Sequence, residues 1–116
     1  MDVQPFFSIG RGLYIGHLGG IEIAACEVGE FCSIHQHVKI GWANVTENEK
    51  YPRIGSYVWI GPHAKIIGNV TIGDSCTISA GTVVLNDINS CNLVAGNPAR
   101  IASTVYDNRS LLRLHK

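Results

Sequence analysis

The residues best suited to chemistry in this 116-residue chain are five histidines and four cysteines. A histidine can take a proton from a substrate near neutral pH or, as the neutral imidazole, bind a metal ion. Two of them, His35 and His37, stand two residues apart on an expected strand and are predicted to point to the same face. A metal site where such a face meets a neighbouring subunit is one alternative for these histidines.

The cysteines do not form a metal-binding or redox motif. The sequence contains no Cys-x-x-Cys pair and no spacing typical of zinc ribbons among Cys26, Cys32, Cys76 and Cys91. Cys32 and Cys76 fall at inward positions of the repeat described next, where a free thiol acts as a small apolar filler. We therefore expect reduced cysteines in a hydrophobic core.

The element that must position these residues is a six-residue repeat over residues 54–89. Its lead position is aliphatic six times in succession: Ile54, Ile60, Ile66, Ile72, Ile78 and Val84. An amphipathic helix repeats its apolar residues every ~3.6 residues and a half-buried strand every ~2, so a period of six indicates neither. We expect each hexapeptide to supply a short strand and a turn of a parallel β-helix, whose stacked coils bury a continuous aliphatic column.

The repeat extends toward both ends of the chain with two interruptions. Its leads continue backward as Ile40, Ile34 and Val28 and then, after a slip of one residue, as Ile21, Ile15 and Ile9. We attribute the slip to a one-residue bulge in residues 22–27. Eight residues beyond one repeat separate Ile40 from Ile54, which predicts a protruding loop at about 42–53. The fold class is therefore all-β, with four to five coils in one domain over residues 1–102 and a tail or short helix over residues 103–116.

Composition excludes several classes of function. Hydrophobic residues make up 46% of the chain and charged residues 16%, the balance of a packed domain rather than a disordered one. Net charge is zero and no basic run is present, so neither nucleic acid nor an anionic membrane is an expected partner. No apolar run approaches the ~18 residues of a membrane span, and no signal-like segment opens the chain. We expect a cytoplasmic protein.

Several segments resemble those of the hexapeptide-repeat acyltransferases, in particular serine O-acetyltransferases and related enzymes of polysaccharide synthesis. The matching segments are residues 9–12 (IGRG), 17–21 (HLGGI), 65–69 (KIIGN), 80–85 (AGTVVL) and 95–101 (AGNPARI). The resemblance covers residues 2–101 and implies a left-handed parallel β-helix. It also implies a homotrimer, because such enzymes bind their cofactor between neighbouring subunits.

The same resemblance implies roles for individual residues. His17 would be the general base that activates an acceptor hydroxyl, and Asp2 would orient its imidazole. The hydroxyl would then attack the thioester of acetyl-CoA, and no metal is expected. The cofactor-binding positions are Gly61, Ala80 and Gly81, with Gly96, Asn97 and Arg100 near the mouth of the groove. Small residues suit a groove in which the pantetheine arm approaches the backbone closely.

Departures from the serine acetyltransferase pattern bear on the acceptor. Gly16 stands where those enzymes have an aspartate before the catalytic histidine, and Lys50 and Tyr51 stand where they have an Arg-His pair. The sequence also does not include their large helical N-terminal domain. We therefore expect a sugar hydroxyl as the acceptor, bound by His35, Tyr51 and Trp42, the last two as stacking surfaces.

Other interpretations stay open at this point. Pro62 stands where the family often has an alanine that offers its N–H, and proline has none to offer the cofactor. A serine O-acetyltransferase proper is the first alternative. The γ-class carbonic anhydrases share the β-helix and bind zinc through histidines at subunit boundaries, so a related metalloenzyme is the second. A non-catalytic β-helix module is the third.

Overall fold

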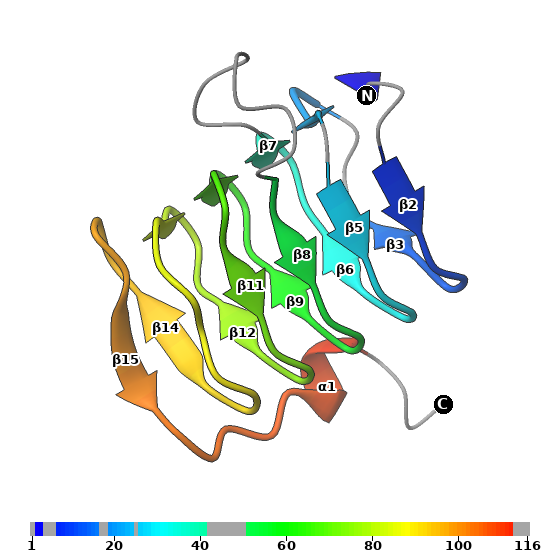
Figure 1. Cartoon of the computed structure of the whole chain (residues 1–116). Helices are drawn as coiled ribbons and strands as arrows, with labels where there is room; N and C mark the ends of the chain where they lie inside the picture. Colours follow the sequence, from blue (N-terminus) through cyan, green and yellow to red (C-terminus); the bar gives the residue numbers. More distant parts are fainter. Residues whose placement is uncertain (1, 4–6, 17–18, 25, 42–50, 113–116) are drawn as a thin grey trace.

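The chain forms a parallel β-helix whose three sheets are the faces of a triangular prism (Figure 1). The computed structural model describes residues 2–3, 7–16, 19–24, 26–41 and 51–112, with side chains from residue 8 onward. Within these ranges the strands are two to four residues long, because the remaining residues of each hexapeptide form the turn at a corner of the prism. The all-β fold expected from the period of six is confirmed.

The three sheets take one strand in turn from each coil. The first sheet contains β1 (Asp2–Val3), β4 (Glu22–Ile23), β7 (Lys39–Gly41), β10 (Lys65–Ile67) and β13 (Val83–Val84). The second contains β2 (Phe7–Ile9), β5 (Cys26–Val28), β8 (Arg53–Ile54) and β11 (Thr71–Ile72). The third contains β3 (Tyr14–Ile15), β6 (Ser33–Ile34), β9 (Trp59–Ile60), β12 (Thr77–Ile78), β14 (Leu93–Ala95) and β15 (Arg100–Ser103). All neighbouring strands are parallel except β14 and β15, which form an antiparallel hairpin at the end of the stack.

The hydrophobic core is the column of lead residues that the period predicted. Ile34, Ile60 and Ile78 are register partners on three successive coils, and each is fully buried. The fifth positions also point inward, and they hold the buried residues Val58, Ala64, Val70, Cys76 and Thr82. Small and β-branched side chains fill the narrow interior between neighbouring sheets. No single coil could bury this surface alone, so the stack is the unit of stability.

The slip in the repeat is not the one-residue bulge that we expected. Ile23, and not Ile21, is the register partner of Ile40 and therefore the lead residue of β4. Ile23 follows Ile15 by eight residues instead of six, and Val28 follows Ile23 by five. Two residues are thus inserted before β4 and one is deleted after it, which leaves the same net slip of one. Both isoleucines are buried, so the sequence alone could not choose between them.

The last coil is shorter than the repeat predicted. Ile88 follows Val84 by only four residues, yet it bridges to Ile72 and takes the lead position on the second sheet. The shortened corner brings the carboxylate of Asp87 to the edge of the sheet, where its Oδ1 accepts a hydrogen bond of 2.8 Å from the Thr71 N–H. On the preceding coils the equivalent strand N–H groups, those of Glu27 and Arg53, donate to backbone carbonyls instead. The Asp87 side chain thus replaces a backbone acceptor.

Two segments leave the regular coil. The predicted loop falls between the end of β7 at Gly41 and the start of β8 at Arg53, and its residues 42–50 lie outside the described ranges. After β15 the chain turns back along the prism to the short helix α1 (Arg109–Leu112), which agrees with the expected C-terminal helix. Among the described residues, none of the helical structure is long and apolar enough to cross a membrane.

Candidate active site

The candidate site lies at the corner between the third sheet and the first, where four residue pairs stack on successive coils. The pairs are Gly19-Gly20, Gln36-His37, Pro62-His63 and Ala80-Gly81. In each step the second residue donates its backbone N–H to the carbonyl of the first residue one coil earlier, as from His37 to Gly19 at 2.8 Å and from Gly81 to Pro62 at 2.9 Å. This ladder fixes which residues of different coils are equivalent.

The ladder locates His17 within the fold. Gly16 is equivalent to His35 and Gly61, and the next equivalent residue on its coil is Gly19. His17 and Leu18 are therefore the two inserted residues, and they have no counterpart on the other coils. Their own placement is outside the described residues. In the sequence, the described residues Gly16 and Gly19 flank the predicted general base.

Asp2 is placed only through its strand. It lies on β1 and is the register partner of Glu22, which follows His17 by five residues in the next coil. The expected proximity of Asp2 to His17 involves side chains outside the described part of the chain. Their pairing stays a prediction.

His35 is held firmly beside the insertion. Its Nδ1 lies 2.8 Å from the carbonyl oxygen of Ile60, and because a carbonyl can only accept, Nδ1 carries the proton. The ring also packs at 4.8 Å on the indole of Trp59. A Cβ atom on Gly16 would stand 2.6 Å from His35 Cδ2 and 3.1 Å from Nε2. His35 therefore occupies the volume that a side chain at position 16 would need.

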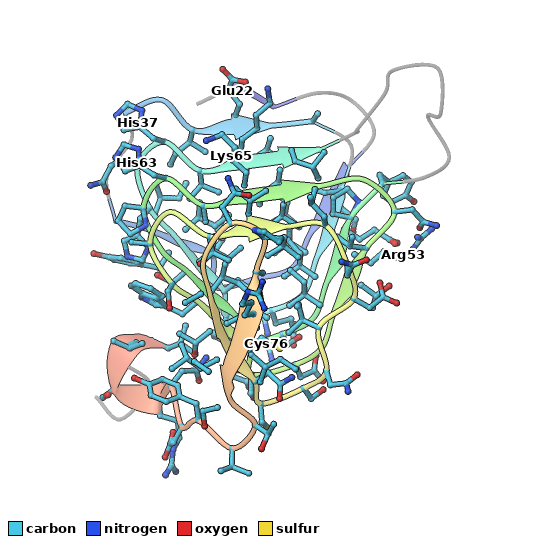
Figure 2. The ribbon with its side chains drawn as sticks, turned by 90° about the vertical axis from the view of Figure 1, so that its left-hand side faces the viewer. Glu22, His37, Arg53, His63, Lys65 and Cys76 are labelled. Carbon is cyan, nitrogen blue, oxygen red and sulfur yellow. The ribbon has the colours of Figure 1, made fainter. Side chains whose placement is uncertain are left out.

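His37 is part of the ladder at this corner and packs on a histidine of the next coil. Its φ is 59°, in the left-handed region, and its ring stacks on that of His63 at 4.7 Å and 18° (Figure 2). β6 ends at Ile34, so His35 and His37 flank a corner and do not share a strand face as we expected. The described residues contain no group of three or more His, Cys, Asp and Glu side chains arranged to hold a metal ion.

The predicted cofactor positions form one column on the later coils. Gly61 is buried against the backbone of Ala80, whereas Ala80 and Gly81 are exposed. Within the described structure the N–H of Ala80 has no hydrogen-bond partner, and a Cβ on Gly81 would meet nothing within 4 Å. Open backbone at Ala80 and Gly81 suits an amide-bearing chain that lies along this corner. The N–H of Gly81 itself already donates a hydrogen bond to the Pro62 carbonyl.

The predicted residues at the mouth of the groove lie at the end of the same corner. Gly96 and Asn97 are exposed in the turn between β14 and β15, and Arg100 is exposed as the first residue of β15. The Gly96 carbonyl accepts a hydrogen bond of 3.0 Å from the Val83 N–H, which ties this turn to the coil that carries Ala80 and Gly81. The six predicted cofactor positions therefore form a continuous strip.

The predicted acceptor residues are not all brought together within one chain. Tyr51 precedes β8 at the corner between the first sheet and the second, and Arg53 lies over its ring at 4.7 Å. Figure 2 shows His37 and His63 at one corner and Arg53 at another, with Glu22 and Lys65 on the face between them. Tyr51 and His35 thus lie at different corners of the prism. Trp42 lies outside the described residues.

Sequence reasoning missed two features of this corner. One is the insertion of His17 and Leu18, for which the signal was the eight-residue spacing from Ile15 to Ile23. The other is Gln36, whose Oε1 is buried and has no hydrogen-bond partner in the described part of the chain. Only its position after His35, next to a corner, could have drawn attention to it.

Comparison with known proteins gives consistent results. Residues 51–86 match the family model described as bacterial transferase hexapeptide (six repeats). The chain is 39% identical over 102 residues to the serine acetyltransferase of Salmonella typhimurium, which covers 87% of this chain and 37% of that protein. These relatives are longer proteins, of which the chain spans between about a third and a little over half.

Solved structures show the same coil. Serine acetyltransferase from Vibrio cholerae superposes with a TM-score of 0.86 at 34% identity, over 96% of this chain and 43% of that one. The Neisseria gonorrhoeae serine acetyltransferase in complex with serine superposes with a TM-score of 0.79 at 35% identity, over 85% of this chain and 41% of that one. The fold is therefore the left-handed parallel β-helix that the resemblance implied.

Proposed function

We propose that the chain is a hexapeptide-repeat acyltransferase that transfers an acetyl group from acetyl-CoA to the hydroxyl of L-serine or a closely similar small molecule. The observation that carries the proposal is the match to serine acetyltransferases over 96% of this chain. The sugar acceptor that we expected has no support among these relatives, so L-serine is the acceptor to test first.

The donor side of the site fits a CoA thioester. The thioester supplies an activated acetyl group and a thiolate leaving group. Along the strip, the space beside Gly81 is open, and the free N–H of the exposed Ala80 can donate to an amide carbonyl of the pantetheine arm. Arg100, exposed at the far end of the strip, can pair with a phosphate. Pro62 removes one donor but leaves its carbonyl bound to Gly81.

The acceptor side of the site provides the base. A hydroxyl is a weak nucleophile until a base removes its proton in the transition state, and a positioned histidine typically contributes about 10²- to 10⁴-fold in rate. His17 takes that role, and Asp2 holds the imidazole in the tautomer that accepts the proton.

Association of three chains is part of the proposal. His35 and Tyr51 lie at different corners of one chain, so both can line one acceptor site only if neighbouring subunits contribute to it. Sedimentation equilibrium should give three times the chain mass of 12.6 kDa. A monomer at the concentration of the activity assay would contradict the shared site. The cytoplasmic location expected from the sequence stays a prediction.

The test is thiol release from acetyl-CoA in the presence of L-serine and, separately, of a panel of sugars, for the wild type and for His17→Ala. We expect turnover with L-serine in the wild type and a loss of about 10²- to 10⁴-fold in kcat for the variant. Binding of CoA, measured by calorimetry, should be unchanged by the substitution. If both proteins are inert with every acceptor and neither binds CoA, the chain is a non-catalytic module.

A further inference from the structure

The imidazole ring of His35 fills the space that a side chain at position 16 would occupy. A Cβ on Gly16 would approach His35 Cδ2 to 2.6 Å, well inside van der Waals contact. His35 cannot simply swing away, because Nδ1 is bonded to the Ile60 carbonyl at 2.8 Å and the ring packs on Trp59. Positions 16 and 35 therefore exclude each other, and the group presented beside the His17 insertion comes from residue 35.

The chemistry of that group follows from its hydrogen bond. With the proton fixed on Nδ1 by the Ile60 carbonyl, the Nε2 of the neutral imidazole is a hydrogen-bond acceptor. Nε2 lies 3.1 Å from the Cβ position of Gly16, the residue directly before His17, and has no partner among the described residues. His35 thus offers an acceptor atom next to the predicted base.

A second unpaired acceptor lies in the same coil. Gln36 follows His35, and its Oε1 is buried without a hydrogen-bond partner within the described ranges. Because this oxygen is shielded from solvent, a bound ligand does not reach it, and it belongs to the interior of the coil. The acceptor that a ligand can meet on this coil is therefore Nε2 of the half-buried His35, and the ligand must carry an N–H or O–H donor.

We propose that His35 Nε2 receives a hydrogen bond from the ammonium group of the acceptor amino acid and is the residue that sets acceptor specificity. This inference rests on the proposed function and adds to it the atom that recognises the acceptor. An ammonium group carries three donors and no acceptor, so it can donate to Nε2 in any of its rotamers. A hydrogen bond from a charged donor is also stronger than one from a neutral hydroxyl.

The first experiment tests the steric exclusion without any ligand. Gly16→Ala should lower Tm by several degrees in the wild type, because the new Cβ meets a pinned ring. The same substitution in a His35→Ala background should lower Tm much less, since the ring is gone. Gly19→Ala is the matched control, because a Cβ there meets nothing within 4 Å. An equal effect of Gly16→Ala in both backgrounds would overturn the exclusion.

The second experiment tests the acceptor atom. Calorimetry compares L-serine with 3-hydroxypropanoate, which lacks only the ammonium group, in the wild type, His35→Asn and His35→Gln. An asparagine amide reaches the place of Nδ1 and keeps the bond to Ile60, whereas a glutamine amide reaches the place of Nε2. We expect the wild type to prefer L-serine by about tenfold or more, His35→Asn to lose the preference, and His35→Gln to keep part of it.

Steady-state kinetics distinguishes a loss of L-serine recognition from a general loss of activity. His35→Asn should raise KM for L-serine about tenfold with little change in KM for acetyl-CoA. If His35→Asn keeps the wild-type preference for L-serine, the assignment of Nε2 is wrong while the proposed function stands. If the wild type turns over acetyl-CoA with another hydroxyl acceptor and does not bind L-serine, the ammonium contact is wrong and the acetyl transfer is not. Failure of all turnover and of CoA binding would reject the proposed function instead.

Discussion

Gly61 lies directly against the backbone of Ala80 on the next coil. A Cβ on Gly61 would stand 2.7 Å from the Ala80 nitrogen and 2.9 Å from Cζ3 of Trp59. The same nitrogen is the one that the described structure leaves without a hydrogen-bond partner. The spacing between these two residues therefore sets both the packing of the coils and the exposure of a donor in the cofactor strip.

Gly61→Ala should destabilise the fold by about 1–3 kcal/mol, because the backbone of a neighbouring coil must move to admit the methyl group. For a domain of this size that corresponds to a fall in Tm of roughly 4–8 °C per kcal/mol. Thermal unfolding followed by circular dichroism checks the prediction. Gly19→Ala, with open space around its Cβ, should leave Tm within a degree or two. Equal Tm values for the two variants would contradict it.

The four cysteines should differ in their reaction with a thiol reagent. Cys26, Cys32 and Cys76 are free and buried, and Cys91 is free and exposed. Burial raises the pKa of each of the three buried thiols, which disfavours the reactive thiolate. Titration with Ellman's reagent at pH 8 should therefore modify one thiol in the native protein and four in guanidinium chloride. Rapid reaction of Cys91→Ser in the native state would show that a buried thiol is accessible.

Stability should fall at alkaline pH because of Cys26. Burial, with a smaller contribution from the negative charge of Glu27, raises the pKa of its thiol from 9.0 to about 11. The native state thus holds a proton that the unfolded chain releases above pH 9, so the contribution of Cys26 is complete below pH 9 and is lost as pH rises toward 11. Urea unfolding from pH 8 to 11 should show this loss. Cys26→Ala should make the decline shallower, and an unchanged slope would argue against Cys26 as its source.

Asn108 should anchor the C-terminal segment. Its buried amide Nδ2 donates to the Tyr57 carbonyl at 2.9 Å and to the Cys76 carbonyl at 3.1 Å, on two successive coils. Asn108→Asp should cost more than Asn108→Ala, because a carboxylate oxygen would face two carbonyl oxygens in a buried site. Hydrogen exchange in residues 104–112 checks the anchoring and should rise in both variants. Substitution of the exposed Asn86 by Ala is the control, and similar exchange in Asn108→Ala and Asn86→Ala would refute the anchor.

Asp2 should affect catalysis through His17 and not through the cofactor. Asp2→Asn is expected to lower kcat less than His17→Ala does, since an amide still fills the space but no longer stabilises the imidazolium that forms. KM for acetyl-CoA should stay at the wild-type value. Steady-state kinetics with L-serine gives both parameters. A larger effect on KM for acetyl-CoA than on kcat would place Asp2 outside the acid–base pair.

Much of the fold could be predicted from the sequence because the β-helix repeats a local pattern. Lead residues such as Ile60 and Ile78 are buried aliphatic side chains at the same position of each hexapeptide. Six such repeats in succession indicate a parallel β-helix. The interruptions could not be predicted to the residue. Ile21 and Ile23 both satisfy an inward position, and the choice between them depends on which one pairs with Ile40 across a coil.

The sequence by itself determined the coil, its inward residues and the resemblance to hexapeptide-repeat acyltransferases, because each of these depends on residue types at short, fixed spacing. The tertiary structure decided what surrounds Gly16. The exclusion of a side chain at Gly16 by His35, the bond from His35 to Ile60 and the stacking of His37 on His63 join residues 19 to 26 positions apart. Such contacts depend on the exact register between coils, which a two-residue insertion shifts without changing the repeat that surrounds it.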